Sequence, residues 1–431
     1  MDIMADNALV TMGVLDNILP YVKDNILSEV NKKSISTEPV DGDLPVVYIT
    51  GEIPTTKKYV KGEIEYISKT SKFKVYTYIK LQGNSSLQYP KKNFTIKLYK
   101  NEARTIKANK EFKNWGAHNN FVLKADYIDI LHARNVVSAK LWSKVVQSRS
   151  DYDMLPDGIK NSPNNGVIDG FPVQVYINGE YHGLYCWTIP KCDWMVGMDS
   201  SNVNHALLSA EFNDNRDIAY QYNPCNFNAL WDGNSDYFDV EIGTNDTTLV
   251  SSLNRFISAV MNTDKTTLEQ VLDIQGAIDY FIFQTVILGT DGLAKNMLLA
   301  TYDMTKWYLC PYDMDATFDL DWEGYILDEY DATPPGYPYN NRYSRLLSFI
   351  LEGYTAQFVA RYFELRKSVL SYSSIISEFE KYITVYGEDI YIQDTINFPA
   401  IPSVPVNTLN SLRTFVKDRL NFLDNYYGQV I

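Results

Sequence analysis

The stretch FKVYTYIKLQGNSSLQYPKKNFTIKLY, residues 73–99, indicates a β-rich fold. Two runs rich in Tyr, Val, Ile, Phe and Thr flank a short loop of Gly, Asn and Ser, which is the pattern of two strands joined by a turn. Similar runs lie at 45–53 and 58–68. Residues 171–189 hold two further runs around an Asn-Gly dipeptide, a strong signal for a tight hairpin turn. We therefore expect a sheet-rich first half.

Helical periodicity dominates the second half, because apolar residues there recur at spacings of three and four. We expect a strand pair around a turn at 303–305, a Pro-broken loop at 398–405, and helices at 134–147, 249–262, 267–288, 344–383 and 407–427. Thr266 or Thr267 is the expected cap of the helix at 267–288. The expected fold class is α+β, with regions at 1–44, 45–260 and 261–431.

The N-terminal region is expected to be an amphipathic helix at 6–32 followed by a polar linker at 33–44. Its apolar residues recur at alternating spacings of four and three, the seam of a short coiled coil, and they are Ala8, Met12, Leu15, Leu19, Val22 and Ile26. Pro20 would kink this helix. The helix either joins copies into a homo-oligomer, docks on a partner, or packs on its own domain.

The charge balance restricts the partners of the chain. Its 431 residues include 39 Lys and Arg and 53 Asp and Glu, a net charge of −14, whereas nucleic-acid binding needs an excess of Lys and Arg. We therefore expect no nucleic-acid partner. The sequence also lacks a long apolar run and a basic segment before an N-terminal apolar run, so we expect no membrane span and no signal peptide. The expected location is cytoplasmic, or within a larger particle.

The first candidate site is the loop Gly83-Asn84-Ser85-Ser86 with Lys91 and Lys92 after it. Glycine lets backbone N–H groups approach an anion, and small hydroxyl side chains supply further donors. A lysine entering the next strand could neutralise a phosphate. A plain hairpin turn is the alternative.

The second candidate site is the segment from Asp291 to Asn296, which follows the apolar helix. An Asp and an Asn five positions apart match the spacing of the kinase catalytic loop, where the Asp orients the attacking hydroxyl and the Asn binds magnesium. The alternative is a turn that simply ends the helix.

The third candidate site is the acidic segment 313–321, which directly follows an apolar strand. Closely spaced carboxylates such as Asp313 and Asp315 repel one another unless a cation compensates them. The segment is not an EF-hand, because Phe318 stands at position six and Gly324 at position twelve. The alternatives are a solvated acidic loop and the nucleophile strand of a haloacid-dehalogenase-type phosphohydrolase. The order of the three sites, phosphate loop, Asp and Asn, then metal-binding Asp, is the order found in protein kinases.

Residues 81–99 resemble the GNSS…PKK signature of the CotH-like kinases (spore coat protein H), an atypical branch of the kinase fold. Segments 123–142, 175–185, 291–296 and 306–318 are similar to the later motifs of that family, and the resemblance covers residues 45–427. It implies a two-lobed kinase-like fold, ATP, a divalent metal such as Mg²⁺, and phosphorylation of Ser or Thr in a protein substrate.

The resemblance also implies roles for single residues. Those that carry a role are Lys92 or Lys91 and the loop Gly83, Asn84, Ser85 and Ser86 for the phosphates, Asp291 for the acceptor hydroxyl, and Asn296 with Asp313 or Asp315 for Mg²⁺. The sequence departs from the family in two places. An acidic residue expected soon after the hairpin strand is absent from 186–190, and Asp319 replaces a Gly. We therefore keep a rival function, a weakly active or inactive structural component of a spore coat or phage tail.

Overall fold

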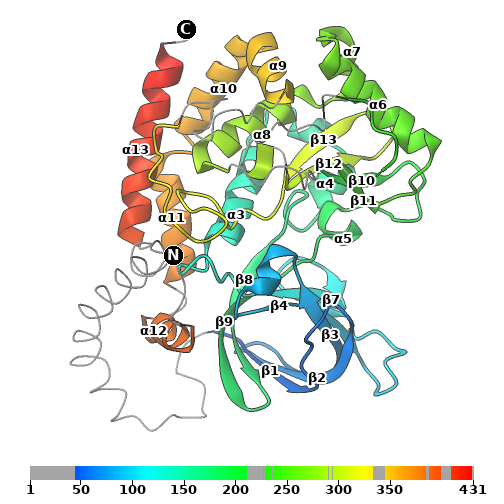
Figure 1. Cartoon of the computed structure of the whole chain (residues 1–431), viewed down its shortest axis with the longest axis vertical. Coiled ribbons are helices and arrows are strands. Elements are labelled where there is room, and N and C mark those ends of the chain that lie inside the picture. The colour runs from blue at the N-terminus through cyan, green and yellow to red at the C-terminus, as the bar shows by residue number, and fades with distance from the viewer. Residues whose placement is uncertain are drawn as a thin grey trace, which may run out of the picture. The chain divides into compact units, whose positions relative to one another are not determined.

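The computed structural model describes residues 44–210, 227, 229–234, 237–289, 291–293, 295–332, 345–384, 388–398 and 409–429. The expected helix at 6–32, its linker and its proposed role in oligomers lie outside these residues. The described part is a mixed α+β fold, with a β-rich N-terminal region and a helix-rich C-terminal region (Figure 1).

A seven-stranded closed barrel forms the N-terminal region (Figure 1). Its strands, in the order β1-β2-β3-β4-β7-β9-β8 around the barrel, are β1 (Val46–Gly51), β2 (Val60–Ile67), β3 (Lys72–Gln82), β4 (Asn93–Tyr99), β7 (Asn120–Lys124), β8 (Gly170–Ile177) and β9 (Glu180–Thr188). The parallel pairing of β1 with β8 closes the barrel, and the other neighbours are antiparallel.

Alternation along the strands sends one set of side chains into the barrel. Ile64, Ile79 and Ile96 lie on three neighbouring strands and are each 0% exposed. The residues directly before and after each of them on the same strand therefore face outward. The β8–β9 hairpin turns at Asn178 and Gly179, both with positive φ, which is the conformation of the expected tight turn. The predicted strands of residues 45–99 and 171–189 are confirmed.

A second sheet lies in the helix-rich region, with the order β11-β10-β12-β13. Its antiparallel strands are β10 (Ala206–Ala210), β11 (Phe238–Ile242), β12 (Met297–Thr301) and β13 (Trp307–Pro311). The pair β12–β13 is the predicted strand pair. The strands β10 and β11 were not predicted, because each is only five residues long and carries no clear alternation.

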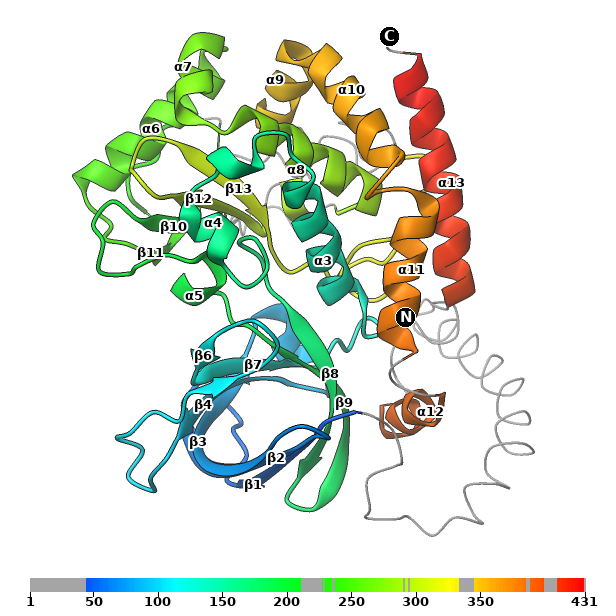
Figure 2. The same ribbon diagram turned by 180° about the vertical axis from the view of Figure 1, so that it is seen from behind.

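Helices surround this sheet and continue to the C-terminus (Figures 1 and 2). The longer ones are α3 (Arg134–Gln147), α6 (Thr247–Met261), α7 (Lys265–Val271), α8 (Ile274–Ile287), α9 (Arg345–Gly353), α10 (Thr355–Arg366), α11 (Tyr372–Ile383), α12 (Glu388–Asn397) and α13 (Leu409–Gly428). α8 is buried around its whole circumference, with Phe281, Ile282 and Phe283 at 0% exposure, as expected for a helix that is apolar on every face.

The single helix expected at 267–288 is wrong, because α7 and α8 are separate. Leu272 leaves the helix and forms a parallel bridge with Trp307. The carboxylate of Asp273 accepts hydrogen bonds of 2.6 and 2.8 Å from Arg149. The expected cap is also wrong, since Asp264 precedes α7 and accepts from the backbone N–H of Thr267 at 3.1 Å.

Candidate functional site

The acidic segment that follows β13 meets the end of barrel strand β7. Lys124 is the last residue of β7, and its Nζ lies 3.0 Å from Oδ1 of Asp313. The Lys124 side chain is 11% exposed and the Asp313 side chain 34% exposed, so the pair is partly open to solvent. Burial opposes ionisation of Asp313, but the positive charge of Lys124 holds the pKa of Asp313 below its usual value.

The register of the second sheet brings Asn296 to the same place. Met297 pairs with Pro311 across β12 and β13, and the N–H of Tyr312 donates to the carbonyl oxygen of Asn296 at 3.0 Å. Asn296 and Asp313 both have positive φ, at 59° and 53°, where non-glycine residues are uncommon. The two residues that the sequence predicts as metal ligands are therefore held next to each other by their backbones.

Asp291 starts the turn between α8 and β12, and it acts electrostatically on the acidic segment. Burial raises the pKa of Asp315 well above its usual value, and the negative charges of Asp313, Asp126 and Asp291 raise it further. The positive charge of Lys124 acts in the opposite direction and lowers the pKa of Asp315. The backbone of the turn is fixed by the Tyr280 hydroxyl, which donates to the carbonyl of Gly292 at 2.6 Å.

The few oxygen donors near Asp313 are typical of a Mg²⁺ site, in which water and substrate phosphates complete the coordination, and not of a site formed by protein side chains alone. Among the described residues, no three His, Cys, Asp or Glu side chains are grouped to hold a metal ion. Magnesium usually binds through one or two carboxylates, several waters and the phosphates of its substrate. Asp313 and the amide of Asn296 carry oxygen donors of this kind, and their binding of Mg²⁺ stays a prediction.

The predicted phosphate loop folds as a short 3₁₀ turn, Ser85–Gln88, between β3 and β4. Gly83 has φ 103°, and a Cβ there would lie 2.0 Å from Oγ of Ser86, so only glycine fits. The ammonium of Lys92 donates to the carbonyl oxygens of Leu87, at 2.6 Å, and Tyr89. Lys92 therefore closes this turn, and its predicted contact with phosphate stays a prediction.

Tyr89 links the phosphate loop to the acidic segment. Its hydroxyl donates to the carbonyl oxygen of Trp322 at 2.8 Å, and its ring stacks on Tyr127 with centroids 5.1 Å apart. Burial and the nearby charge of Asp315 raise the pKa of Tyr89 to about 12. Trp322 directly follows the acidic segment, so the predicted loop lies in the same part of the fold as that segment, where the pairing of β12 with β13 also brings Asn296.

Lys91 points away from solvent into a buried charge network. Its Nζ lies 2.8 and 2.9 Å from the two carboxylate oxygens of Asp394 on α12 and donates to the carbonyl of Leu184 at 2.5 Å. His132 Nε2 lies 3.0 Å from the same carboxylate, and the N–H of Leu184 donates to it at 2.8 Å. Burial opposes the charge of Asp394, yet these donors, Lys91 first, hold its pKa well below the usual value.

Helix α12 therefore supplies a buried carboxylate to Lys91. Neither α12 nor a role for Asp394 was predicted, because a ten-residue helix between two loops gives a weak periodic signal. Gly183 makes the approach possible, since a Cβ there would lie 2.3 Å from Oδ1 of Asp394.

A family model described as CotH kinase protein matches residues 79–423. The chain belongs to the CotH kinase family. No curated protein matches the sequence. The match includes the predicted phosphate loop, Lys124, the segment 291–296, the acidic segment and α12.

Two residues of this CotH kinase family member were given no role from its sequence. Lys124 ends a strand whose three preceding residues are all buried. A lysine directly after such an apolar run is the signal in the sequence that could have indicated a charge with a specific partner. Arg134 is 1% exposed and donates from Nε to the carbonyl of Thr317 at 2.8 Å. Its Nη1 lies 2.5 Å from Oδ1 of Asp129, which also accepts from the backbone N–H groups of Ala133 and Arg134 at the start of α3. Arg134 thus fixes the acidic segment against α3.

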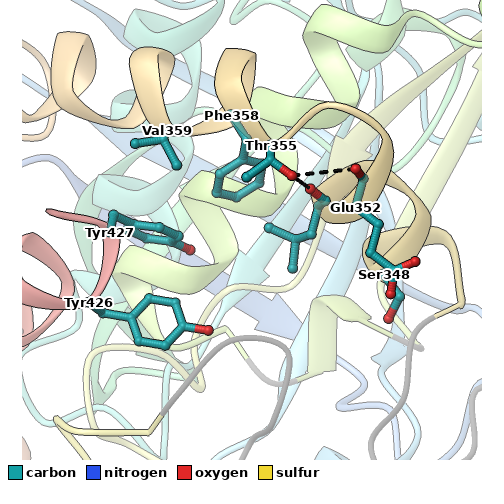
Figure 3. Close-up of a pocket in the computed structure, with 8 residues that line it drawn as sticks. Ser348, Glu352, Thr355, Phe358, Val359, Tyr426 and Tyr427 are labelled. Atoms are coloured by element: carbon teal, nitrogen blue, oxygen red, sulfur yellow. Dashed lines mark hydrogen bonds between the residues drawn. The ribbon is translucent and has the colours of Figure 1, made fainter. Parts of the chain in front are cut away.

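A pocket of about 240 Å³ lies elsewhere in the CotH fold, between α9, α10 and α13 (Figure 3). Phe358 and Val359 line one side, and Tyr426 and Tyr427 another. None of the residues given a role above lines this pocket. No helix among the described residues is long and apolar enough to cross a membrane.

Proposed function

We propose that this CotH family member is an atypical protein kinase with a two-lobed kinase-like arrangement, which transfers the γ-phosphoryl group of ATP to a Ser or Thr hydroxyl of a protein. The observation that carries the proposal is the contact of Lys124 with Asp313 at 3.0 Å, beside Asn296. A lysine, a metal-type Asp and an Asn are parts that position a nucleotide in kinases. Here Lys124 contacts Asp313, and a backbone hydrogen bond to Tyr312 holds Asn296 beside that segment.

Each side chain has a distinct task in this proposal. Mg²⁺, when bound, would neutralise the charge of the β- and γ-phosphates. Asn296 and Asp313 are the oxygen donors suited to hold it, and Asp315 is the second carboxylate on the same segment. Lys124 would exchange its contact with Asp313 for a phosphate oxygen, which leaves the Asp313 carboxylate open to the metal.

Asp291 is the proposed partner of the acceptor hydroxyl, because it lies on the turn that leads into Asn296. The loop Gly83–Ser86, whose turn Lys92 closes, would border the phosphates, whereas Lys91 is buried in its contact with Asp394. Since phosphoryl transfer needs little covalent chemistry from the protein, positioning and charge compensation account for most of the catalysis in this scheme. The regions 45–260 and 261–431 stay proposed boundaries of its two parts.

The test is incorporation of ³²P from labelled ATP into casein and into the chain itself, by wild type, Asp291→Asn and Asp313→Asn. We expect Asp291→Asn to keep Mg-ATP binding and to lose phosphoryl transfer by a factor of roughly 10²–10⁴, the range for a positioned acid–base group. Asp313→Asn should lose both. Transfer by Asp291→Asn at the wild-type rate would refute the assigned role, and a wild-type chain that neither binds Mg-ATP nor transfers phosphate would support the rival structural function.

A further inference from the structure

The barrel carries a charge opposite to that of the whole chain. Residues 44–124, which hold five of the seven barrel strands, contain 16 Lys and Arg and 5 Asp and Glu, whereas the whole chain contains 39 and 53. The net charge of −14 therefore conceals a strongly basic region. Positive charge concentrated on one part of a protein attracts anionic partners to that part.

The basic residues gather on the outer face of β2, β3 and β4. Lys61 of β2 pairs with Tyr78 of β3, which pairs with Lys97 of β4, so the three side chains form one row across neighbouring strands. Lys80 lies two residues further along β3, and Tyr59 precedes β2. We call these five residues the Lys–Tyr face.

The lysines of the Lys–Tyr face are not neutralised by the protein. Among the described residues, Lys61, Lys80 and Lys97 form no ion pair. The two acidic residues of β2 are already compensated, because Glu63 pairs with Lys74 at 2.8 Å and Glu65 with Lys72 at 3.2 Å. Three ammonium groups on one sheet face thus remain for an external anion.

The aromatic rings of this face are covered by cations. The Nζ atoms of Lys80 and Lys97 each lie 5.0 Å from the centre of the Tyr59 ring, and the Arg104 guanidinium lies 5.4 Å from that of Tyr78. Single-stranded nucleic acids bind by stacking bases on open aromatic faces. Here cations lie over the rings, so the surface offers ammonium groups more readily than stacking platforms.

We propose that the Lys–Tyr face binds an acidic segment of a protein, rich in Asp and Glu. Lys61 and Lys97 lie two strand spacings apart, about 10 Å, so a short extended segment can place carboxylates near both. A long polyanion would also meet the negative remainder of the chain, whereas a short acidic segment need contact only the barrel. This assignment does not depend on the proposed kinase activity.

The test uses the full chain and a fluorescein-labelled peptide of about 15 residues, mostly Glu, in fluorescence anisotropy at low salt, about 20 mM, where surface charges are weakly screened. The variant is Lys61→Glu with Lys80→Glu. Its matched control is Lys367→Glu with Lys417→Glu, two exposed lysines of the helix-rich region, so both variants change the net charge equally. Circular dichroism melts check folding, and Lys61→Gln with Lys80→Gln is the milder second variant.

We expect binding by the wild type that weakens with added salt, a loss of roughly tenfold or more in the face variant, and a change of less than about twofold in the control. The Gln variant should fall between wild type and the Glu variant. The proposal is overturned if the wild type does not bind the peptide, or if both Glu variants lose affinity equally. It is also overturned if a dT oligonucleotide of equal charge binds the same face more tightly, which would identify a nucleic acid as the occupant.

Discussion

Asp394→Asn is the substitution that most directly probes how α12 supports the candidate site. The carboxylate of Asp394 is 3% exposed and accepts from Lys91, from the N–H of Leu184 and, at 3.0 Å, from His132. The asparagine side chain has the same size as the aspartate, but it lacks the negative charge and one of the two acceptor oxygens. Lys91 is therefore left as a buried cation without a compensating charge. Breaking a buried ion pair by changing one partner costs about 3–5 kcal/mol, and we expect a loss in this range.

The assay is urea unfolding at pH 7, with hydrogen exchange of the amides at 181–185 as a local readout. Asp157→Asn is the control, because Asp157 is 86% exposed in its pair with Lys160 and surface pairs contribute about 0–1 kcal/mol. The local exchange should rise in Asp394→Asn and stay unchanged in the control. A loss below about 1 kcal/mol would refute the reasoning.

The pair Lys91→Met with Asp394→Asn separates loss of a charge pair from loss of packing. Removing both charges leaves no buried ion without a partner, so the double variant should be more stable than Asp394→Asn alone. Equal or lower stability of the double variant would mean that the ammonium of Lys91 is satisfied without Asp394, through the carbonyl of Leu184.

Three further predictions follow, two from the contacts of Asp394 and one from the contact of Lys124 with Asp313. Gly183→Ala places a Cβ 2.3 Å from Oδ1 of Asp394, at φ 114°, so it should destabilise the chain. Its effect should be less than additive with that of Asp394→Asn in a double-mutant cycle measured by urea unfolding. Strict additivity would contradict the shared contact. Because the pKa of Asp394 is depressed from its ordinary 3.8, its contribution is present above pH 3.8 and is lost as the pH falls below it. The difference in unfolding free energy between wild type and Asp394→Asn should therefore be smaller at pH 3 than at pH 7. A larger difference at pH 3 would contradict a depressed pKa of Asp394. Lys124→Met removes the cation beside Asp313. It should weaken Mg-ATP binding, measured by isothermal titration calorimetry, by roughly 2 kcal/mol, the contribution of one charge-assisted hydrogen bond. Unchanged affinity would show that Lys124 does not contact the phosphates.

Local patterns were enough to predict the elements that build the barrel. The strands at 45–99 and the Asn178-Gly179 hairpin follow from alternation and turn chemistry within a few residues, and α3 has the bounds expected from the sequence, 134–147. The break between α7 and α8 could not be predicted in the same way. It depends on Arg149 and Trp307, which lie far from Asp273 in sequence.

In the candidate site, too, some residues could be predicted from local sequence and others could not. The order of the Gly83 loop, Asp291, Asn296 and Asp313 along the chain is visible in the sequence, and β12–β13 pairing brings the last two together. The partners of the two lysines are not visible. Lys91 meets Asp394 across 303 positions and Lys124 meets Asp313 across 189, and nothing local signals contacts that only tertiary packing creates.

Thermal melting with and without Mg-ATP, on wild type and on Asp313→Ala, tests the central claim that the segment after β13 holds a nucleotide through its metal. A ligand that binds only the folded chain, at a hundred times its dissociation constant, adds about 2.7 kcal/mol, which raises the melting temperature measurably. The account predicts a rise for wild type that is absent from Asp313→Ala. No rise for wild type, or the same rise for both, would contradict it.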